Sequence, residues 1–136
     1  LITSSLELYG NTPVTSFFSI VHARNTGGVF GFLQAHQYAP YIFLVLPVLI
    51  AGVLAFMIFS GKLSSAKTLA LSFIFAGAIG NIYDRFAYGN VVDFLDFYYG
   101  NYHWPAFNVA DISICVGIGL WFYIELFHSK KEPSPS

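Results

Sequence analysis

Two long runs without charge restrict the possible folds of this chain more than any other feature of its sequence. Residues 41–59 and 68–83 contain no charged side chain. As a helix rising about 1.5 Å per residue, the first run would cover about 28 Å, close to the hydrocarbon thickness of a bilayer, about 30 Å. Both runs are therefore predicted to be transmembrane helices, and Pro47 is tolerated in a helix of this kind.

The composition of the chain agrees with this class of protein. Charged residues make up 10% and apolar residues 56% of the sequence, against roughly 25% and 45–50% in a soluble domain. A net charge of -1 with six Lys and Arg residues gives no basic surface for phosphate, so nucleic-acid binding is not expected. The single cysteine, Cys115, excludes an intrachain disulfide. Because the histidines lack the spacing of a zinc motif, no metal and no other cofactor is expected.

A third apolar run, 112–124, would cover only about 20 Å as a helix, which is shorter than the membrane. A charged residue should then lie at the membrane edge, either Asp111 before the run or Glu125 after it. An ionisable group at that depth is unfavourable and indicates a functional site.

The fold class predicted is an α-helical integral membrane protein, a helix bundle with three spans in this sequence and a small extramembrane β-sheet. β-branched and aromatic residues around the turn-like 25–28 indicate short strands whose aromatic side chains suit lipid head groups. Small residues in 76–80 would let a neighbouring helix approach closely. The predicted parts of the single membrane domain, 1–136, are a β-rich segment at 1–40, transmembrane helices at 41–60, 68–83 and 110–127, an active-site segment at 84–109 and a tail at 129–136.

Lysines predict the orientation of the chain in the membrane. They occur in the loop at 61–67 and again after the last apolar run, at 130–131. Both places fall on one side of the membrane, which the positive-inside rule makes cytoplasmic. Segments 1–40 and 84–109 then share the outer face, where they can meet although they are distant in sequence.

Aspartates of the polar segment are the candidates for chemistry. Asp111 is the strongest, and Asn108 three residues earlier also fits a helix N-cap with an acid at the third position. An aspartate that activates water needs a partner carboxylate, because two close carboxylates separate their pKa values. Asp84 is interpreted as an ion pair with Arg85 at the end of a span.

Two partners for Asp111 remain, and the spacing of the residues does not choose between them. Asp93 and Asp96 would face opposite sides of a strand and the same side of a helix. If 91–97 is extended, they are therefore not partners of each other. Asn25, Asn81 and Asn108 have side chains that would orient carboxylates or a substrate carbonyl, although asparagines in turns and caps commonly need no such role.

Four motifs together resemble the bacterial lipoprotein signal peptidase family, signal peptidase II. N-T-G-G-V-F-G-F at 25–32 is similar to the family pattern N-x-G-x-x-F-G, and G-N-I-Y-D-R at 80–85 to G-N-x-x-D-R. V-V-D-F at 91–94 and W-P-A-F-N-V-A-D at 104–111 resemble V-D-F and P-x-F-N-x-A-D. The family also has an upstream helix with a polar D-Q-x-x-K segment, which would make four spans, and the sequence here is expected to start after it.

The resemblance implies an aspartyl endopeptidase that cleaves signal peptides before a diacylglyceryl-modified cysteine. It implies Asp93 and Asp111 as the catalytic pair, and so chooses between the two partners. The implied supporting residues are Asn25, Gly28, Asn81, Arg85, Asn108 and Ala110.

Partners and location follow from the same resemblance. The substrates would be diacylglyceryl-modified prolipoproteins, the surroundings membrane lipids of the bacterial inner membrane with the site near its outer face, and the enzyme a monomer. Substrate contacts are expected from the aromatic residues Phe30, Phe32, Phe94 and Trp104. The alternative is a small membrane transporter or channel with interfacial carboxylates. A transporter should carry ionisable groups near midspan, whereas 41–59 and 68–83 have none.

Overall fold

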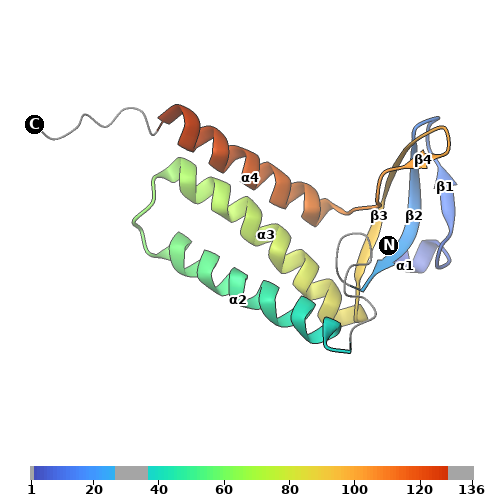
Figure 1. Ribbon diagram of the computed structural model, residues 1–136, viewed down its shortest axis with the longest axis horizontal. Helices are drawn as coiled ribbons and strands as arrows, with labels where there is room; N and C mark the ends of the chain where they lie inside the picture. Colours follow the sequence, from blue (N-terminus) through green and yellow to red (C-terminus); the bar gives the residue numbers. More distant parts are fainter. Residues whose placement is uncertain (1, 27–36, 129–136) are drawn as a thin grey trace, which may run out of the picture.

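A computed structural model describes residues 2–26 and 37–128 of the chain (Figure 1). Three long helices lie side by side: α2 (Ala39–Phe59), α3 (Ser65–Tyr88) and α4 (Val109–His128). All three are long and apolar enough to cross a membrane. A small sheet lies at one end of the three helices (Figure 1). The predicted fold class, a helical membrane protein with a small β-sheet, is confirmed.

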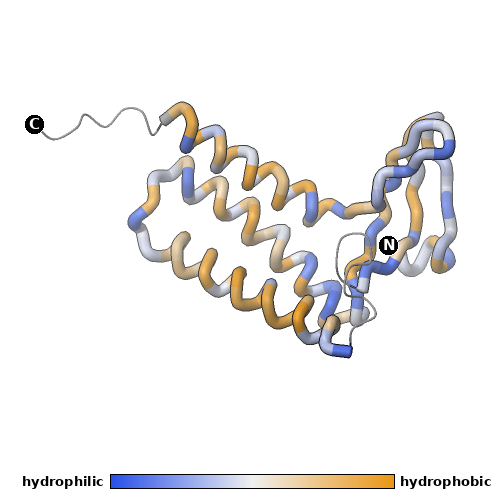
Figure 2. Tube along the Cα trace, viewed as in Figure 1, coloured by the Kyte–Doolittle hydropathy of each residue, from blue (hydrophilic) through white to orange (hydrophobic). Residues whose placement is uncertain are grey.

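Apolar and hydrophilic residues occupy different parts of the structure (Figure 2). Apolar residues cover the middle of each helix, whereas hydrophilic residues gather in the loop between α2 and α3 and where α3 meets the sheet. Large apolar side chains of α2 are exposed along its length, among them Leu49 at 62% and Phe56 at 75%. One side of α2 packs against α3, where Ala51 and Leu54 are buried, and its exposed apolar sides are suited to lipid rather than to water.

Helix α3 runs well beyond the predicted 68–83 at both ends. Ser64 is its N-cap, and its side chain accepts a hydrogen bond from the backbone N–H of Lys67. At the other end Gly89 has φ 73°, the left-handed conformation that ends helices and favours glycine. A prediction based on absence of charge excluded residues such as Asp84 and Arg85, although the last turn of the helix includes them.

Helix α4 is also longer than its apolar run. Its 20 residues correspond to about 30 Å, so it includes both polar residues between which the sequence left a choice. Asp111 lies in the first turn. Near the other end Glu125 forms an ion pair with Lys67 of α3, with Oε1 and Nζ 2.7 Å apart, and Lys67 also lies over the Trp121 ring, 5.3 Å from its centroid.

Glycines let α3 and α4 approach closely. A Cβ added at Gly77 of α3 would overlap the carbonyl oxygen of Ala110, and one at Gly117 of α4 would lie 2.6 Å from the carbonyl oxygen of Ala70. Small residues at such contacts are typical of helix packing in membranes. The predicted close approach at 76–80 is confirmed. It holds the start of α4 against the C-terminal half of α3.

The sheet joins segments that are distant in sequence. Its antiparallel strands follow the order β1 (Asn11–Pro13), β2 (Phe18–Asn25), β3 (Val91–Tyr99) and β4 (Tyr102–His103), and a short helix, α1 (Ile2–Ser5), precedes them. Strand β2 is paired with β1 and β3, and the second arm of the hairpin predicted about 25–28 lies outside the described residues. The expected meeting of the two polar segments is confirmed at Asn25, which is opposite Val91.

Candidate active site

Asp93 lies on β3 with only 4% of its surface exposed. Its Oδ2 accepts a hydrogen bond from Nδ2 of Asn25 on β2, at 3.3 Å, and its Oδ1 accepts one from Nδ2 of Asn108 at 2.9 Å. Strand pairing places β2 and β3 in register here, with Ala23 opposite Asp93. Residues from two other segments, β2 and the start of α4, therefore bind this carboxyl group.

Asp111 is held by a reciprocal cap at the start of α4. The backbone N–H of Asn108 donates to Asp111 Oδ2 at 3.0 Å, and the backbone N–H of Asp111 donates to Asn108 Oδ1 at 3.1 Å. The predicted cap is confirmed. Asp111 Oδ1 also accepts from Nδ2 of Asn81 on α3, at 3.0 Å. Two N–H donors, one from the side chain of Asn81 and one from the backbone of Asn108, therefore fix the Asp111 carboxyl group in the first turn of α4.

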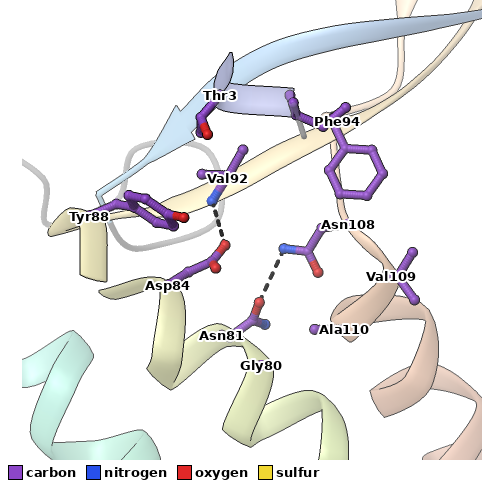
Figure 3. Close-up of a pocket in the computed structure, with 11 residues that line it drawn as sticks. Thr3, Gly80, Asn81, Asp84, Tyr88, Val92, Phe94, Asn108, Val109 and Ala110 are labelled. Carbon is purple, nitrogen blue, oxygen red and sulfur yellow. Dashed lines mark hydrogen bonds between the residues drawn. The ribbon is translucent and has the colours of Figure 1, made fainter. Parts of the chain in front are cut away.

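Asn108 connects the two aspartates. Its amide Nδ2 donates to Asp93 Oδ1 and also to Oδ1 of Asn81, at 3.1 Å (Figure 3). Its amide oxygen is occupied by the cap to Asp111. Asn108 thus contacts the Asp93 carboxyl group through its side chain and the Asp111 carboxyl group through its backbone N–H, and its side-chain amide has a single orientation that satisfies all these partners.

Burial raises the pKa of Asp93 to about 6, and this is the largest influence on it. The hydrogen bond from Asn25 acts in the opposite direction, the nearby charge of Asp111 raises the pKa again, and Asn108 and Arg85 lower it. The two carboxyl groups are therefore close enough to interact electrostatically while they occupy different environments. Such a pair is suited to hold one protonated and one ionised acid.

Asp96 is separate from this pair. It is also buried on β3, but Ser19 Oγ donates to its Oδ2 at 2.9 Å, and His103 Nδ1 is 2.9 Å from the same oxygen. The sequence spacing did not distinguish Asp93 from Asp96 as the partner of Asp111. The structure connects Asp93 to Asp111, whereas it gives Asp96 partners within the sheet.

The predicted ion pair between Asp84 and Arg85 is wrong. Asp84 Oδ2 instead accepts from the backbone N–H of Val92 at 3.0 Å, so it ties the end of α3 to β3. Arg85 Nη1 donates to the backbone carbonyl of Asn81, four residues earlier on the helix, at 3.1 Å. Arg85 Nε is buried and, within the described part of the chain, has no hydrogen-bond partner. The bond from Asp84 to β3 was missed because an acid just before a turn has no specific sequence signal.

The remaining supporting residues have different outcomes. Ala110 lies against α3, where its Cβ would be 3.1 Å from a Cβ at Gly80. Gly28, Phe30 and Phe32 lie outside the described residues.

Within 2–26 and 37–128, no group of three or more His, Cys, Asp or Glu side chains is placed to hold a metal ion.

A pocket of about 260 Å³ lies next to Asn81 and Asn108, and neither Asp93 nor Asp111 lines it (Figure 3). Polar groups of Asn81, Asp84 and Asn108 line it together with the apolar side chains of Phe94 and Val109. Two of these asparagines are the ones that bond to the aspartates. The pocket therefore offers a mixed polar and apolar surface beside the two asparagines that bond to the carboxyl groups.

The fold and this site define a helical membrane protein with a pair of interacting carboxyl groups at one end of its spans. Residues 1–127 match the family model described as signal peptidase (SPase) II. The chain belongs to the signal peptidase II family, and it is a peptidase embedded in a bacterial membrane.

Relatives and solved structures agree with this family. The lipoprotein signal peptidase of Geobacter sulfurreducens is 41% identical over 139 residues, which cover 99% of this chain and 85% of the relative. The lipoprotein signal peptidase of Geobacter metallireducens is 45% identical over 138 residues, 98% of this chain and 83% of the relative. A bacterial membrane enzyme solved by the in meso method at 2.3 Å resolution is similar with a TM-score of 0.82 and 29% identity, covering 99% of this chain and 82% of that one.

Proposed function

We propose that this chain is an aspartic endopeptidase that removes signal peptides from lipid-modified prolipoproteins by cleaving before the diacylglyceryl-modified cysteine. The observation that carries the proposal is the linkage of Asp93 and Asp111 through Asn108, with N–H···O distances of 2.9 and 3.0 Å. Membership in the signal peptidase II family supports the substrate class. Named relatives are lipoprotein signal peptidases.

The environments of the two acids support distinct roles. Asp93, whose pKa burial raises to about 6, is the general acid. Asp111 accepts hydrogen bonds from Asn81 and from the backbone of Asn108, so it is the general base. An acid and a base of this kind are the two groups that peptide hydrolysis by water requires.

The reaction we propose has no covalent intermediate. Asp111 takes a proton from a water molecule, whose oxygen forms a bond to the scissile carbonyl carbon, while Asp93 gives its proton to the carbonyl oxygen. The resulting tetrahedral diol breaks its C–N bond: Asp93 takes back a hydroxyl proton as the carbonyl reforms, and Asp111 protonates the leaving amine. Both carboxyl groups return to their starting states, so one water is consumed per bond broken.

Supporting residues would bind and orient the groups that react. Asn81 and Asn108 hold the aspartates, and Asn25 donates to Asp93 from the neighbouring strand. Arg85 braces the site, because its Nη1 donates to the backbone carbonyl of Asn81 on the same helix. Gly28 and Ala110 complete the supporting set, with Ala110 at the contact between α3 and α4.

The substrate would approach from lipid. Its apolar signal helix and acyl chains are suited to the apolar exposed faces of the spans, and Phe94, which lines the pocket, provides aromatic surface on the sheet side. Trp104 lies apart from this pocket, at another end of the sheet. The lysine distribution supports a site near the outer face of the bacterial cytoplasmic membrane. All groups of the mechanism come from one chain, so the proposed active unit is a monomer.

A cleavage assay with purified protein in lipid nanodiscs tests the proposal. A diacylglyceryl-modified precursor should be cut before the modified cysteine, and the same precursor without the lipid should remain intact. Cleavage should be unchanged by EDTA. Failure to cut the modified precursor, or equal cutting of both forms, would contradict the proposed substrate class, and loss of activity on chelation would contradict the aspartic mechanism.

The pH dependence of kcat/KM tests the roles of the two acids. Because Asp93 must carry a proton, activity should fall as pH rises above its pKa of about 6. Asn25 donates to the carboxylate and lowers this pKa, so Asn25→Ala should raise it and move the falling limb to higher pH. Kinetics measured at several pH values checks the direction of the change.

Ser19→Ala is the matched control for this pH experiment. Ser19 lies on the same strand as Asn25 but donates to Asp96, so its replacement should leave the limb in place. The assignment of Asp93 as the acid would be contradicted if kcat/KM of Asn25→Ala fell at a lower pH than that of the unmodified protein. An equal shift of the pH profile in both variants would also contradict it.

A further inference from the structure

An exposed aromatic cluster lies at the end of the sheet where β3 joins β4, apart from the candidate active site. Its most exposed members are Phe17 at 55%, Tyr99 at 87%, Tyr102 at 83% and Trp104 at 69%. These four residues, called the aromatic edge below, line a shallow groove with a volume of about 470 Å³. Phe97 also lines this groove. Single exposed aromatics are ordinary, whereas four that adjoin one another indicate an interaction surface.

The aromatic edge lies to the side of the helix bundle. In Figure 1 the strands cross the ends of the helices, and the end that joins β3 to β4 projects past α4. It is therefore not covered by α4. In a membrane the ends of the spans lie at the lipid head groups, so a sheet that crosses them extends along that same layer.

The chemistry of the aromatic edge fits this layer. Tyrosine and tryptophan combine an apolar ring with a polar O–H or N–H group and are enriched at membrane interfaces for that reason. Segments 13–18 and 97–107, which provide the cluster, contain no Asp, Glu, Lys or Arg. A partner recognised through charge is thus disfavoured, and an amphipathic lipid surface is favoured.

Interactions within the sheet hold the aromatic edge in a fixed shape. The imidazole of His103 stacks on Tyr98 at 5.1 Å and contacts buried Asp96, which Ser19 also binds. Tyr98 donates its hydroxyl proton to the carbonyl oxygen of Thr15 at 2.8 Å. A rigid aromatic surface loses little conformational freedom when it binds.

We propose that the aromatic edge inserts into the head-group layer of the bilayer beside α4 and anchors the sheet there. Its ligand is the zwitterionic phospholipid surface that surrounds the spans. Asp93 lies on β3, which ends in this edge. The anchor therefore also fixes the position of Asp93 along the membrane normal relative to Asp111. The proposal depends on the membrane spans and on the exposed aromatic residues, and it is independent of the proposed catalytic activity.

Tryptophan fluorescence tests the anchor directly, since the chain has only two tryptophans. Trp121→Phe leaves Trp104 as the reporter, and Trp104→Phe leaves Trp121, a half-buried residue of span α4 beneath Lys67, as the comparison. Each variant is placed in phosphatidylcholine nanodiscs with or without acyl chains brominated close to the head group. Quenching by the brominated lipid is compared with quenching by aqueous iodide.

The anchor predicts that Trp104 is quenched more strongly by the brominated lipid than by iodide, with emission shifted to the blue relative to a free tryptophan derivative. Stronger quenching by iodide than by the brominated lipid would overturn the proposal. A separate measurement uses Tyr99→Ser combined with Tyr102→Ser, which should increase iodide quenching of Trp104 severalfold. Because none of these measurements requires turnover, their result is distinguishable from failure of the cleavage assay.

Discussion

Asparagine at position 93 or 111 is expected to reduce kcat/KM for a lipid-modified precursor by roughly 10²–10⁴-fold, the contribution typical of a general acid or base. Each substitution keeps the shape of the side chain and its place among Asn25, Asn81 and Asn108. It removes the carboxyl group that gives or takes the proton. Cleavage measured with both single variants in nanodiscs checks the result.

Thermal stability measurements distinguish loss of catalysis from loss of folding in Asp93→Asn. Because burial raises the pKa of folded Asp93 from 3.8 to about 6, the folded state binds the proton more tightly than the unfolded chain does. The stability from this protonation is complete below the unfolded pKa and is lost as pH rises through about 6. The thermal midpoint of Asp93→Asn should therefore exceed that of the unmodified protein at pH 8, with a difference that shrinks toward pH 4.

Asp96→Asn provides the matched control on the same strand. Asp96 is buried like Asp93, but its partners are Ser19 and His103. The variant should lose some stability, because His103 then lacks a charged partner, while kcat/KM per folded molecule stays close to that of the unmodified protein. Substantial cleavage by Asp93→Asn or Asp111→Asn, or equal losses in all three variants, would contradict a pair formed by Asp93 and Asp111.

Gly77→Ala is expected to impair activity through the packing of two helices. The added Cβ would overlap the carbonyl oxygen of Ala110 and lie 2.6 Å from Ile114 Cγ1, so α4 must move away from α3. Extra atoms in a packed contact typically cost about 1–3 kcal/mol. Asp111 directly follows Ala110, and a displacement of about 1 Å at a reacting group is enough for a loss of about 10²-fold. The loss should be in kcat, with KM changed little.

Gly52→Ala and Gly119→Ala are controls in comparable helices. A Cβ at either position meets no atom within 4 Å. Alanine has the higher helix propensity, so these variants should be as stable as the unmodified protein or slightly more so. Unfolding followed by thermal denaturation and kinetics of cleavage, measured together, distinguish the three. If Gly77→Ala behaves like the two controls, close contact between α3 and α4 does not position Asp111.

Much of the fold followed from the sequence because the bilayer leaves few choices. Absence of charge over 41–59 and 68–83 is sufficient to predict two spans. The ends of the helices were less predictable, since charge does not terminate a helix: α3 includes Asp84 and Arg85 and ends only at Gly89, where the backbone turns left-handed. Small residues at Gly77 correctly predicted a close helix contact.

The candidate site was only partly predictable from the residues themselves. The spacing of Asn108 and Asp111 predicted the cap, because a helix start involves neighbours in sequence. The choice between Asp93 and Asp96 depends on which face of β3 meets α3 and Asn108, and alternation along one strand cannot show that. The bond from Asp84 to Val92 likewise depends on how β3 approaches α3, which is a contact between separate elements.

Asn108 and Asp111 lie at the start of α4, the last helix in the described residues, and this has a consequence for biosynthesis. A ribosome that has made residues up to 107 has produced β3 with Asp93, yet neither the group that bridges the pair nor its second acid exists. The partly made chain therefore has no complete site while it is being inserted. With Asp93 and Asp111 as the proposed catalytic pair, assembly of α4 against α3 completes the site, so cleavage is expected only after α4 has been inserted.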